Sequence, residues 1–143
     1  MALAAAISLA VGGLQAGDER IVLLDASPET IALGEVVYAE TCASCHGADL
    51  EGQPDWQSRG ADGLLPAPPH DASGHTWHHD GDTLFRLTKY GIGALIGDPD
   101  HQTDMPIYDG ILSDDEIVAA LSYIKSTWPE EIRAVHDDME NGR

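Results

Sequence analysis

The sequence predicts an all-α protein, because three stretches of the chain have the capping residues or the apolar spacing of helices. Ser27-Pro28-Glu29 places a serine at the N-cap, a proline at the first helical position and an acid in the first turn. Ser113-Asp114-Asp115-Glu116 has the spacing of a capping box. Between them, Asp82 to Tyr90 carries the apolar residues of a short middle helix.

The boundaries of these elements follow from residues that favour or stop helices. We expect the first helix to run from Pro28 to Thr41. Glycine, proline and aspartate are frequent between Gly47 and Gly81, which predicts a long loop, and a second irregular stretch is expected from Gly91 to Gly110. The last long helix follows Ser113 and stops at Pro129. Its apolar stripe consists of Ile117, Leu121, Ile124 and Trp128.

The length of 143 residues predicts a single domain. We place this domain at residues 28–129, after a linker at residues 17–27. Residues 130–143 form an acidic C-terminal tail in this division, either as a short outer helix or as a frayed end.

Residues 1–16 carry no charge and are nearly all small or aliphatic. They are shorter than the roughly 20 residues of a membrane-spanning helix. They suit the apolar region of a secretory signal peptide, with Ala16 as a candidate cleavage position. No lysine or arginine precedes Arg20, so a short membrane anchor and a buried helix remain as alternatives. A signal peptide or an anchor would place the domain outside the cytoplasmic membrane, and we predict a periplasmic protein.

The charge balance restricts the partners of the chain. Seven lysines and arginines against 25 aspartates and glutamates give a formal net charge of −18. This charge argues against nucleic acid and anionic membrane surfaces as partners, so membrane contact is expected only through a retained N-terminal segment. A redox partner protein with a basic docking patch would complement the charge, because complementary fields raise the rate of encounter. Solubility in a salty environment is the alternative explanation.

Cys42-Ala43-Ser44-Cys45-His46 carries the strongest chemical signal. Two cysteines three apart, with a histidine directly after the second, form the pattern of covalent c-type haem attachment. Two thiols on one short helical turn can add across the two vinyl groups of one porphyrin edge. His46 then lies beneath the iron and can donate an imidazole nitrogen as the proximal ligand. The pattern therefore predicts one covalent haem c.

The cysteine pair alone has three other interpretations: a thioredoxin-like redox pair, half of a zinc site and a structural disulfide. A zinc site usually shows a second ligand pair of similar spacing, and the chain has no other cysteines. A thioredoxin-like site follows a strand and opens a helix, whereas this pair ends a helical stretch. These observations favour the haem.

With its elements in this order, the chain resembles the class I (monohaem) c-type cytochromes of the small bacterial periplasmic type. The resemblance covers roughly Pro28 to Pro129. Gly34 and Tyr38 stand where the family's N-terminal helix crosses its C-terminal helix, and Tyr123-Ile124-Lys125 matches that second helix. The resemblance implies a cytochrome c fold, in which crossed terminal helices, a short middle helix and long loops surround one covalent haem.

The resemblance also implies that Met105 is the distal ligand of the haem iron. Asp104-Met105-Pro106-Ile107-Tyr108 matches the family's Met-Pro-x-aromatic motif. A thioether is a soft ligand that favours ferrous iron, so this ligation raises the reduction potential relative to two histidines. A methionine in a loop can instead be a filler of the core. His101 is a weaker competitor for the sixth position.

Further residues are candidates for contacts around the haem. In the family a proline carbonyl accepts a hydrogen bond from the proximal histidine and so orients it. The candidates for this proline are Pro66, Pro68 and Pro69. Hydrogen-bond donors for the haem propionates are available on Trp56, Arg59, Trp77 and Tyr90. For each of these four side chains taken separately, ordinary packing or solvent exposure is the favoured explanation.

Four histidines are concentrated in the long loop: His70, His75, His78 and His79. With two nearby carboxylates they could bind copper or zinc. They could also be solvated loop residues or bond to a propionate, and one of them could displace Met105.

The sequence thus predicts a soluble or membrane-tethered one-electron carrier. No acid/base pair or nucleophile stands out, so we do not expect an enzyme. Two alternatives remain, a haem c subunit of a larger membrane oxidoreductase and a haem-based sensor with a labile sixth ligand.

Overall fold

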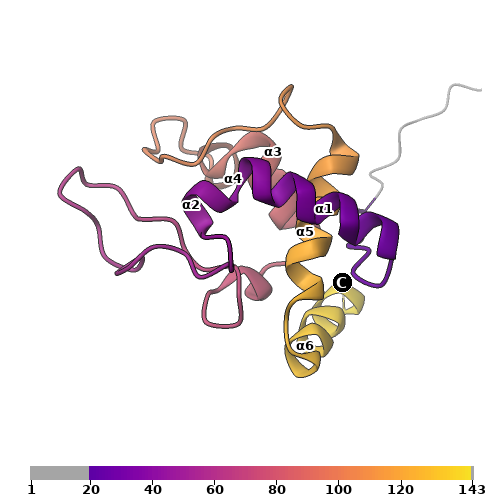
Figure 1. Cartoon of the computed structure of the whole chain (residues 1–143). Coiled ribbons are helices and arrows are strands. Elements are labelled where there is room, and N and C mark those ends of the chain that lie inside the picture. The colour runs from indigo at the N-terminus through magenta and orange to yellow at the C-terminus, as the bar shows by residue number, and fades with distance from the viewer. Residues whose placement is uncertain (1–19, 143) are drawn as a thin grey trace, which may run out of the picture.

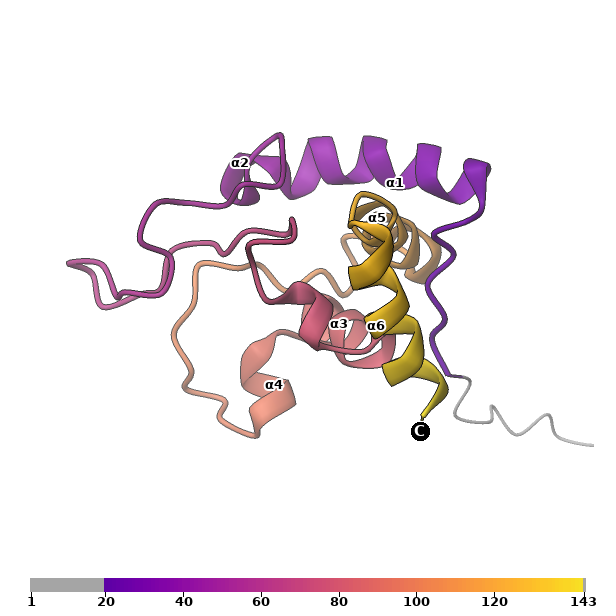
Figure 2. The same cartoon turned by 90° about the horizontal axis from the view of Figure 1, so that it is seen from below.

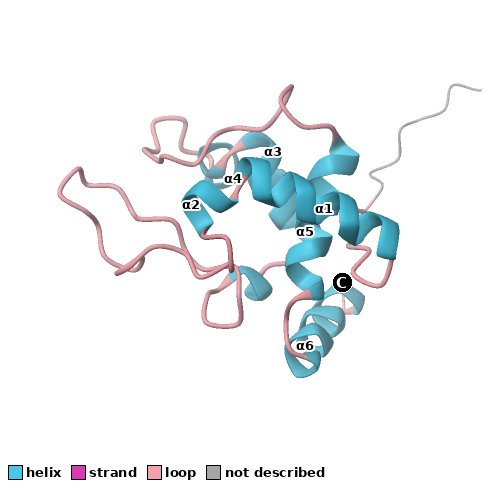
Figure 3. Cartoon of the chain, in the orientation of Figure 1, coloured by secondary structure: helices cyan, strands magenta, loops and turns pink. Residues whose placement is uncertain are grey.

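The computed structural model describes residues 20–142, and every regular element among them is a helix (Figure 3). The elements in chain order are α1 (Pro28–Thr41), α2 (Ala43–His46), the 3-10 helix η1 (Thr76–His78), α3 (Gly81–Tyr90), α4 (Ile92–Ile96), α5 (Asp114–Ser126) and α6 (Glu130–Asn141). The all-α prediction is confirmed. The signal peptide or anchor predicted at residues 1–16, and the first part of the linker, lie outside the described residues.

Local side-chain contacts start the two long helices where the sequence predicts them. At the start of α1, the Ser27 hydroxyl accepts a hydrogen bond from the Thr30 backbone N–H at 3.3 Å. At the start of α5, Ser113 and Glu116 form both hydrogen bonds of a capping box. A cap of this kind contributes about 1 kcal/mol to stability, so a few neighbouring residues suffice to set each boundary.

The crossing of α1 over α5 organises the fold (Figures 1 and 2). A Cβ atom added to Gly34 would overlap the carbonyl oxygen of Ala119 and lie 2.8 Å from the Cβ of Tyr123. Only glycine permits backbones to approach this closely. Beside the crossing, the ring centroids of Tyr38 and Tyr123 lie 5.6 Å apart. The crossed helices that the resemblance implies are therefore present.

The core lies beneath this crossing, and α5 provides much of it. Ile117 is fully buried, and the other members of the predicted apolar stripe are at most 6 % exposed. The stripe is thus confirmed as the inner face of the helix. α5 itself ends at Ser126, so Trp128 reaches the core from the turn that precedes Pro129.

The stretch from Gly91 to Gly110, expected to be irregular, contains the helix α4. Gly91 and Gly97 flank this helix with φ angles of 83° and 73°. Gly97 has a left-handed conformation that ends the helix at no steric cost. A helix this short does not develop a recognisable apolar period, which explains why the sequence pattern did not reveal it.

The C-terminal residues form helix α6 rather than a frayed end. On this helix the apolar Val135 is 51 % exposed. His136 occupies the buried position instead, fully shielded from solvent beside the Trp128 ring. The chain therefore buries a polar side chain on α6, while Ile132 of the same helix packs against the hydrophobic core.

Ion pairs join α6 to the N-terminal segment. Arg20 and Glu140 are paired at 3.0 Å, while the buried Lys125 ammonium contacts the carboxylates of Asp25 and Asp137 at 3.2 and 2.5 Å. These contacts attach both ends of the described chain to α5. No helix within residues 20–142 has the length and apolarity that crossing a membrane requires.

Candidate functional site

The Cys42–His46 segment lies at the junction of α1 and α2, beside the core (Figure 1). The backbone N–H of Cys42 donates to the Tyr38 carbonyl, and that of His46 donates to the Cys42 carbonyl, both at 2.9 Å. Cys42 packs against the core, Cys45 is exposed, and both are free thiols. One helical turn thus presents two thiols next to a histidine, as covalent attachment of haem requires.

The alternative interpretations of the cysteine pair find little support in this geometry. Burial raises the pKa of the Cys42 thiol, whereas the reactive thiol of a thioredoxin-like pair has a lowered pKa. The pair also follows a helix rather than a strand. Among residues 20–142, no group of three or more histidine, cysteine or acidic side chains could hold a metal ion, which argues against zinc.

His46 is held in the state that a metal ligand needs. Its side chain is buried, and Nδ1 lies 2.8 Å from the carbonyl oxygen of Pro68, one of the three prolines that the resemblance proposed. A carbonyl can only accept, so Nδ1–H donates and the neutral ring keeps its lone pair on Nε2. Burial lowers the pKa of His46, which favours this neutral form. The imidazole is therefore ready to bind iron through Nε2.

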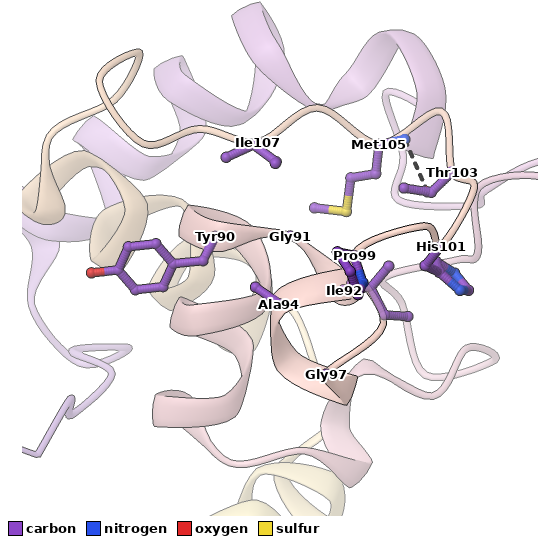
Figure 4. Close-up of a pocket in the computed structure, with 11 residues that line it drawn as sticks. Tyr90, Gly91, Ile92, Ala94, Gly97, Pro99, His101, Thr103, Met105 and Ile107 are labelled. Atoms are coloured by element: carbon purple, nitrogen blue, oxygen red, sulfur yellow. Dashed lines mark hydrogen bonds between the residues drawn. The ribbon is translucent and has the colours of Figure 1, made fainter.

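Met105 lies in the loop that follows α4 and lines an open cavity of about 450 Å³. Figure 4 shows its side chain directed from the loop into this space, with Ile92 and Pro99 on the far side. The backbone N–H of Met105 donates to the Thr103 hydroxyl at 3.2 Å. Met105 and Cys42 both pack against the same hydrophobic core. Two thiols, one imidazole and one thioether around one apolar core are a donor set that fits haem c.

A family model described as cytochrome c matches residues 31–128. The chain belongs to the cytochrome c family. It is a class I c-type cytochrome, and proteins of this family transfer electrons through covalently bound haem c. The comparisons with curated proteins and with solved structures found no match.

Tyr108 connects the two sides of this cytochrome, a role that sequence reasoning missed. Its hydroxyl donates to the Thr41 carbonyl at 2.9 Å, next to the first cysteine, and its backbone N–H donates to the Thr88 carbonyl at 3.3 Å. The side chain is buried in the core. Its place in the Met-Pro-x-aromatic motif was the available signal, but the motif does not reveal which carbonyl the hydroxyl reaches.

The candidate propionate donors of the cytochrome have different surroundings. The Trp77 indole N–H donates to the Ala72 carbonyl at 3.3 Å, and Arg59 donates to the Gly63 carbonyl at 2.7 Å. Trp56 stacks on His75, with ring centroids 5.2 Å apart. Tyr90 is 44 % exposed and lines the cavity beside Met105. Tyr90 is thus the candidate closest to the cavity, while Trp77 and Arg59 satisfy donors within their own loop.

The four loop histidines do not converge on a common point. His70 stacks on His46, with ring centroids 4.0 Å apart and planes inclined by 24°. His78 lies instead against Trp77, at 3.8 Å between ring centroids. His75 and His79 meet edge to face, at 5.8 Å between ring centroids. This arrangement does not form the copper or zinc site that the sequence left open.

Proposed function

We propose that this cytochrome carries one electron at a time on a single haem c, bound through Cys42 and Cys45, with His46 and Met105 as axial ligands. The hydrogen bond from His46 to Pro68 carries the proposal, because it leaves the Nε2 lone pair available beside two free thiols. The chain has only these two cysteines, which supports one haem. When bound, the haem iron would supply the change between ferric and ferrous states.

The residues of the chain have distinct tasks in this proposal. Each thiol adds its S–H across one vinyl group, so the cysteines serve as anchors. His46 donates through Nε2 while Pro68 keeps Nδ1 protonated. Met105 offers a soft thioether, which stabilises the reduced state relative to a second histidine. The core beneath α1 and α5 keeps water from one side of the site. No residue is required to transfer a proton or form a covalent intermediate, so we propose a carrier without enzymatic activity.

The charge distribution supports a partner protein with a basic docking patch. The chain carries a formal net charge of −18, and several of its few cations are already engaged in ion pairs. Lys125 contacts Asp25 and Asp137, while Lys89 contacts Asp114. The acidic surface is therefore weakly compensated, and a basic partner would be attracted to it over several ångströms.

We propose that the protein works in the periplasm, because covalent haem attachment and an apolar N-terminal segment are both typical of exported proteins. Intact mass measurement of the protein isolated from its native cells checks this proposal. Loss of residues 1–16 indicates a cleaved signal peptide. Their retention together with membrane co-purification indicates a tethered haem subunit of a larger oxidoreductase instead.

Optical spectra of the oxidised and reduced protein, together with a pyridine haemochrome, test the central proposal. We expect one haem c per chain and a long-wavelength sulfur-to-iron charge-transfer band. Met105→Ala should abolish this band and lower the reduction potential. Met139→Ala, which removes a methionine on α6, is the matched control and should leave both unchanged. Absence of haem overturns the proposal, and persistence of the band in Met105→Ala overturns the ligand assignment.

A second candidate function, a sensor with a labile sixth ligand, is favoured by one observation. Met105 is only partly buried, and its backbone is held by a neighbouring threonine rather than by another element. Such a ligand would be displaced by carbon monoxide in the native ferrous protein. The carrier proposal predicts that the native protein resists carbon monoxide, so rapid binding at neutral pH decides for the sensor.

A further inference from the structure

His70 lies face to face with the histidine that is proposed to bind the iron. The ring centroids of His70 and His46 are 4.0 Å apart, and the two planes are inclined by only 24°. Of the four histidines in the loop, His70 is the one stacked on His46.

Contacts from several elements hold His70 in this orientation. Its Nδ1 is hydrogen-bonded to the hydroxyl of the buried Thr76 in η1, at 2.7 Å. Its backbone N–H donates to the Leu50 carbonyl, and its own carbonyl accepts from the Trp128 indole, each at 2.8 Å. The His70 ring and the Tyr38 ring of α1 also meet in a T-shaped arrangement, at 6.2 Å between centroids. A side chain fixed from so many directions can impose its angle on a neighbour.

The hydrogen bond between His46 and Pro68 holds only the Nδ1 edge of the imidazole. A carbonyl bonded at this edge restrains rotation of the ring about the axis along which an Nε2–metal bond points. A second flat ring against the imidazole face resists the same rotation directly, because turning one ring drives its edge into the other.

We propose that His70 is a positioning residue that sets the plane of the His46 imidazole and, through it, the orientation of the ligand field at a bound haem iron. The inference rests on the proposed function, since it needs His46 as the proximal ligand. An aliphatic side chain at position 70 would fill the same space but would not fix the plane of the His46 ring. The flat His70 ring, held by the Thr76 hydroxyl, fixes that plane.

Three variants of the haem-loaded protein separate ring orientation from simple packing. His70→Leu removes the flat ring and keeps apolar bulk. His70→Phe keeps a flat ring but loses the bond to Thr76, and Thr76→Val keeps the histidine while removing its anchor. His75→Leu is the matched control, because His75 is exposed and stacks on Trp56 instead.

Proton NMR of the ferric protein reports the plane of the axial imidazole, because the spread and order of the four haem methyl resonances depend on it. We expect this pattern to change strongly in His70→Leu. It should change to a lesser degree in His70→Phe and in Thr76→Val, because both keep a flat ring but lose its bond to the Thr76 hydroxyl. It should stay close to that of the unmodified protein in His75→Leu. The thermal unfolding midpoint, measured in parallel, shows whether a change follows orientation or only stability.

An unchanged methyl pattern in folded His70→Leu overturns the inference, as does an equal change in His75→Leu. If His70→Leu does not fold, His70→Phe and Thr76→Val decide, and a methyl pattern unchanged in both of them overturns the inference. Spectra of the unmodified protein distinguish failure of the His70 inference from failure of the proposed function. Absence of a haem spectrum or of the sulfur-to-iron band there refutes the proposed function before any His70 variant is compared.

Discussion

The peptide around His46 and the loop around Met105 face the same core, but different kinds of contacts hold them. His46 bonds to a carbonyl 22 residues away, and the His70 beside it bonds to an indole 58 residues away. The hydrogen bonds of the described residues 98–105 join positions no more than five apart. A long-range anchor appears only at Tyr108, which reaches Thr41.

This difference has a consequence for folding and for ligation. Contacts between distant elements form together with the fold, so the proximal side is organised by the tertiary structure itself. Contacts between neighbouring residues survive local opening and constrain a loop weakly. We therefore expect changes on the proximal side to cost stability, and changes in the Met105 loop to affect mainly the bond to iron.

Gly34→Ala should have the largest effect, because α1 carries the cysteine motif and must approach α5 closely. The added methyl group would overlap the Ala119 carbonyl, and we expect a loss of about 3 kcal/mol in the free energy of unfolding. Denaturant titration measures it. Gly63→Ala is the control, since its Cβ meets no atom within 4 Å and its φ of 83° alone costs about 1 kcal/mol. Equal losses in the two variants would contradict the close crossing.

Trp128→Phe comes next, since it leaves the His70 carbonyl without its indole donor. An acceptor left unpaired in a buried setting costs about 1–3 kcal/mol, so we expect a loss of about 2 kcal/mol in unfolding free energy. Trp77→Phe removes a longer bond to the Ala72 carbonyl from a more accessible ring and should lose less. A larger loss in Trp77→Phe would show that the described proximal network is not what stabilises the fold.

The pH dependence of stability should reveal the buried His136. Burial and the nearby Lys125 lower its pKa, while Glu140, Asp137 and the His79 carbonyl partly oppose them. A histidine whose pKa is lowered on folding binds more protons when unfolded. Stability is therefore complete above the unfolded pKa of about 6.5 and decreases as the pH falls below it.

His136→Leu isolates this contribution from those of the other histidines. Between about pH 7.5 and about pH 5.5, we expect the native chain to lose about 1 kcal/mol more stability than the variant, measured by denaturant titration at each pH. A steeper loss in the variant than in the native chain refutes the role assigned to His136.

Thr103→Val should have the smallest effect, because it removes a local bond in the Met105 loop. The threonine is exposed, so water can replace its hydroxyl, and we expect a change below about 0.5 kcal/mol in unfolding free energy. Thr76→Val is the matched control on the proximal side and should cost more, since Thr76 is buried. A larger loss of unfolding free energy in Thr103→Val than in Thr76→Val would contradict the difference between the Met105 loop and the His46 side.

Residues that act on near neighbours were predictable from the sequence. Ser27 and Ser113 cap the helices that follow them, and the apolar stripe of α5 faces the core. Helix α4 was not predicted, because it is too short to show an apolar period. On α6, hydrophobicity alone does not identify the buried residue, because the helix geometry and its neighbours bury His136 and leave Val135 exposed.

At the candidate site, too, local features were predictable from the sequence and long-range contacts were not. The cysteine–histidine pattern predicts haem attachment because the cofactor's two vinyl groups demand that spacing within one helical turn. The family resemblance left three prolines as candidates for the hydrogen-bond acceptor of His46, and the tertiary structure shows that Pro68 is the acceptor. The stacking of His70 on His46 left no sequence signal, because it depends on how the long loop returns to α2.

By itself, the sequence determined the two long helices with their caps, the attachment motif and the acidic charge, all of which depend on residues close together in the chain or on composition. Only the tertiary structure decided that Gly34 meets Ala119, that Trp128 donates to His70 and that His70 faces His46. Each of these contacts joins segments at least twenty residues apart. Their geometry is set by the crossing of α1 and α5 and by the path of the long loop, and no local pattern encodes either one.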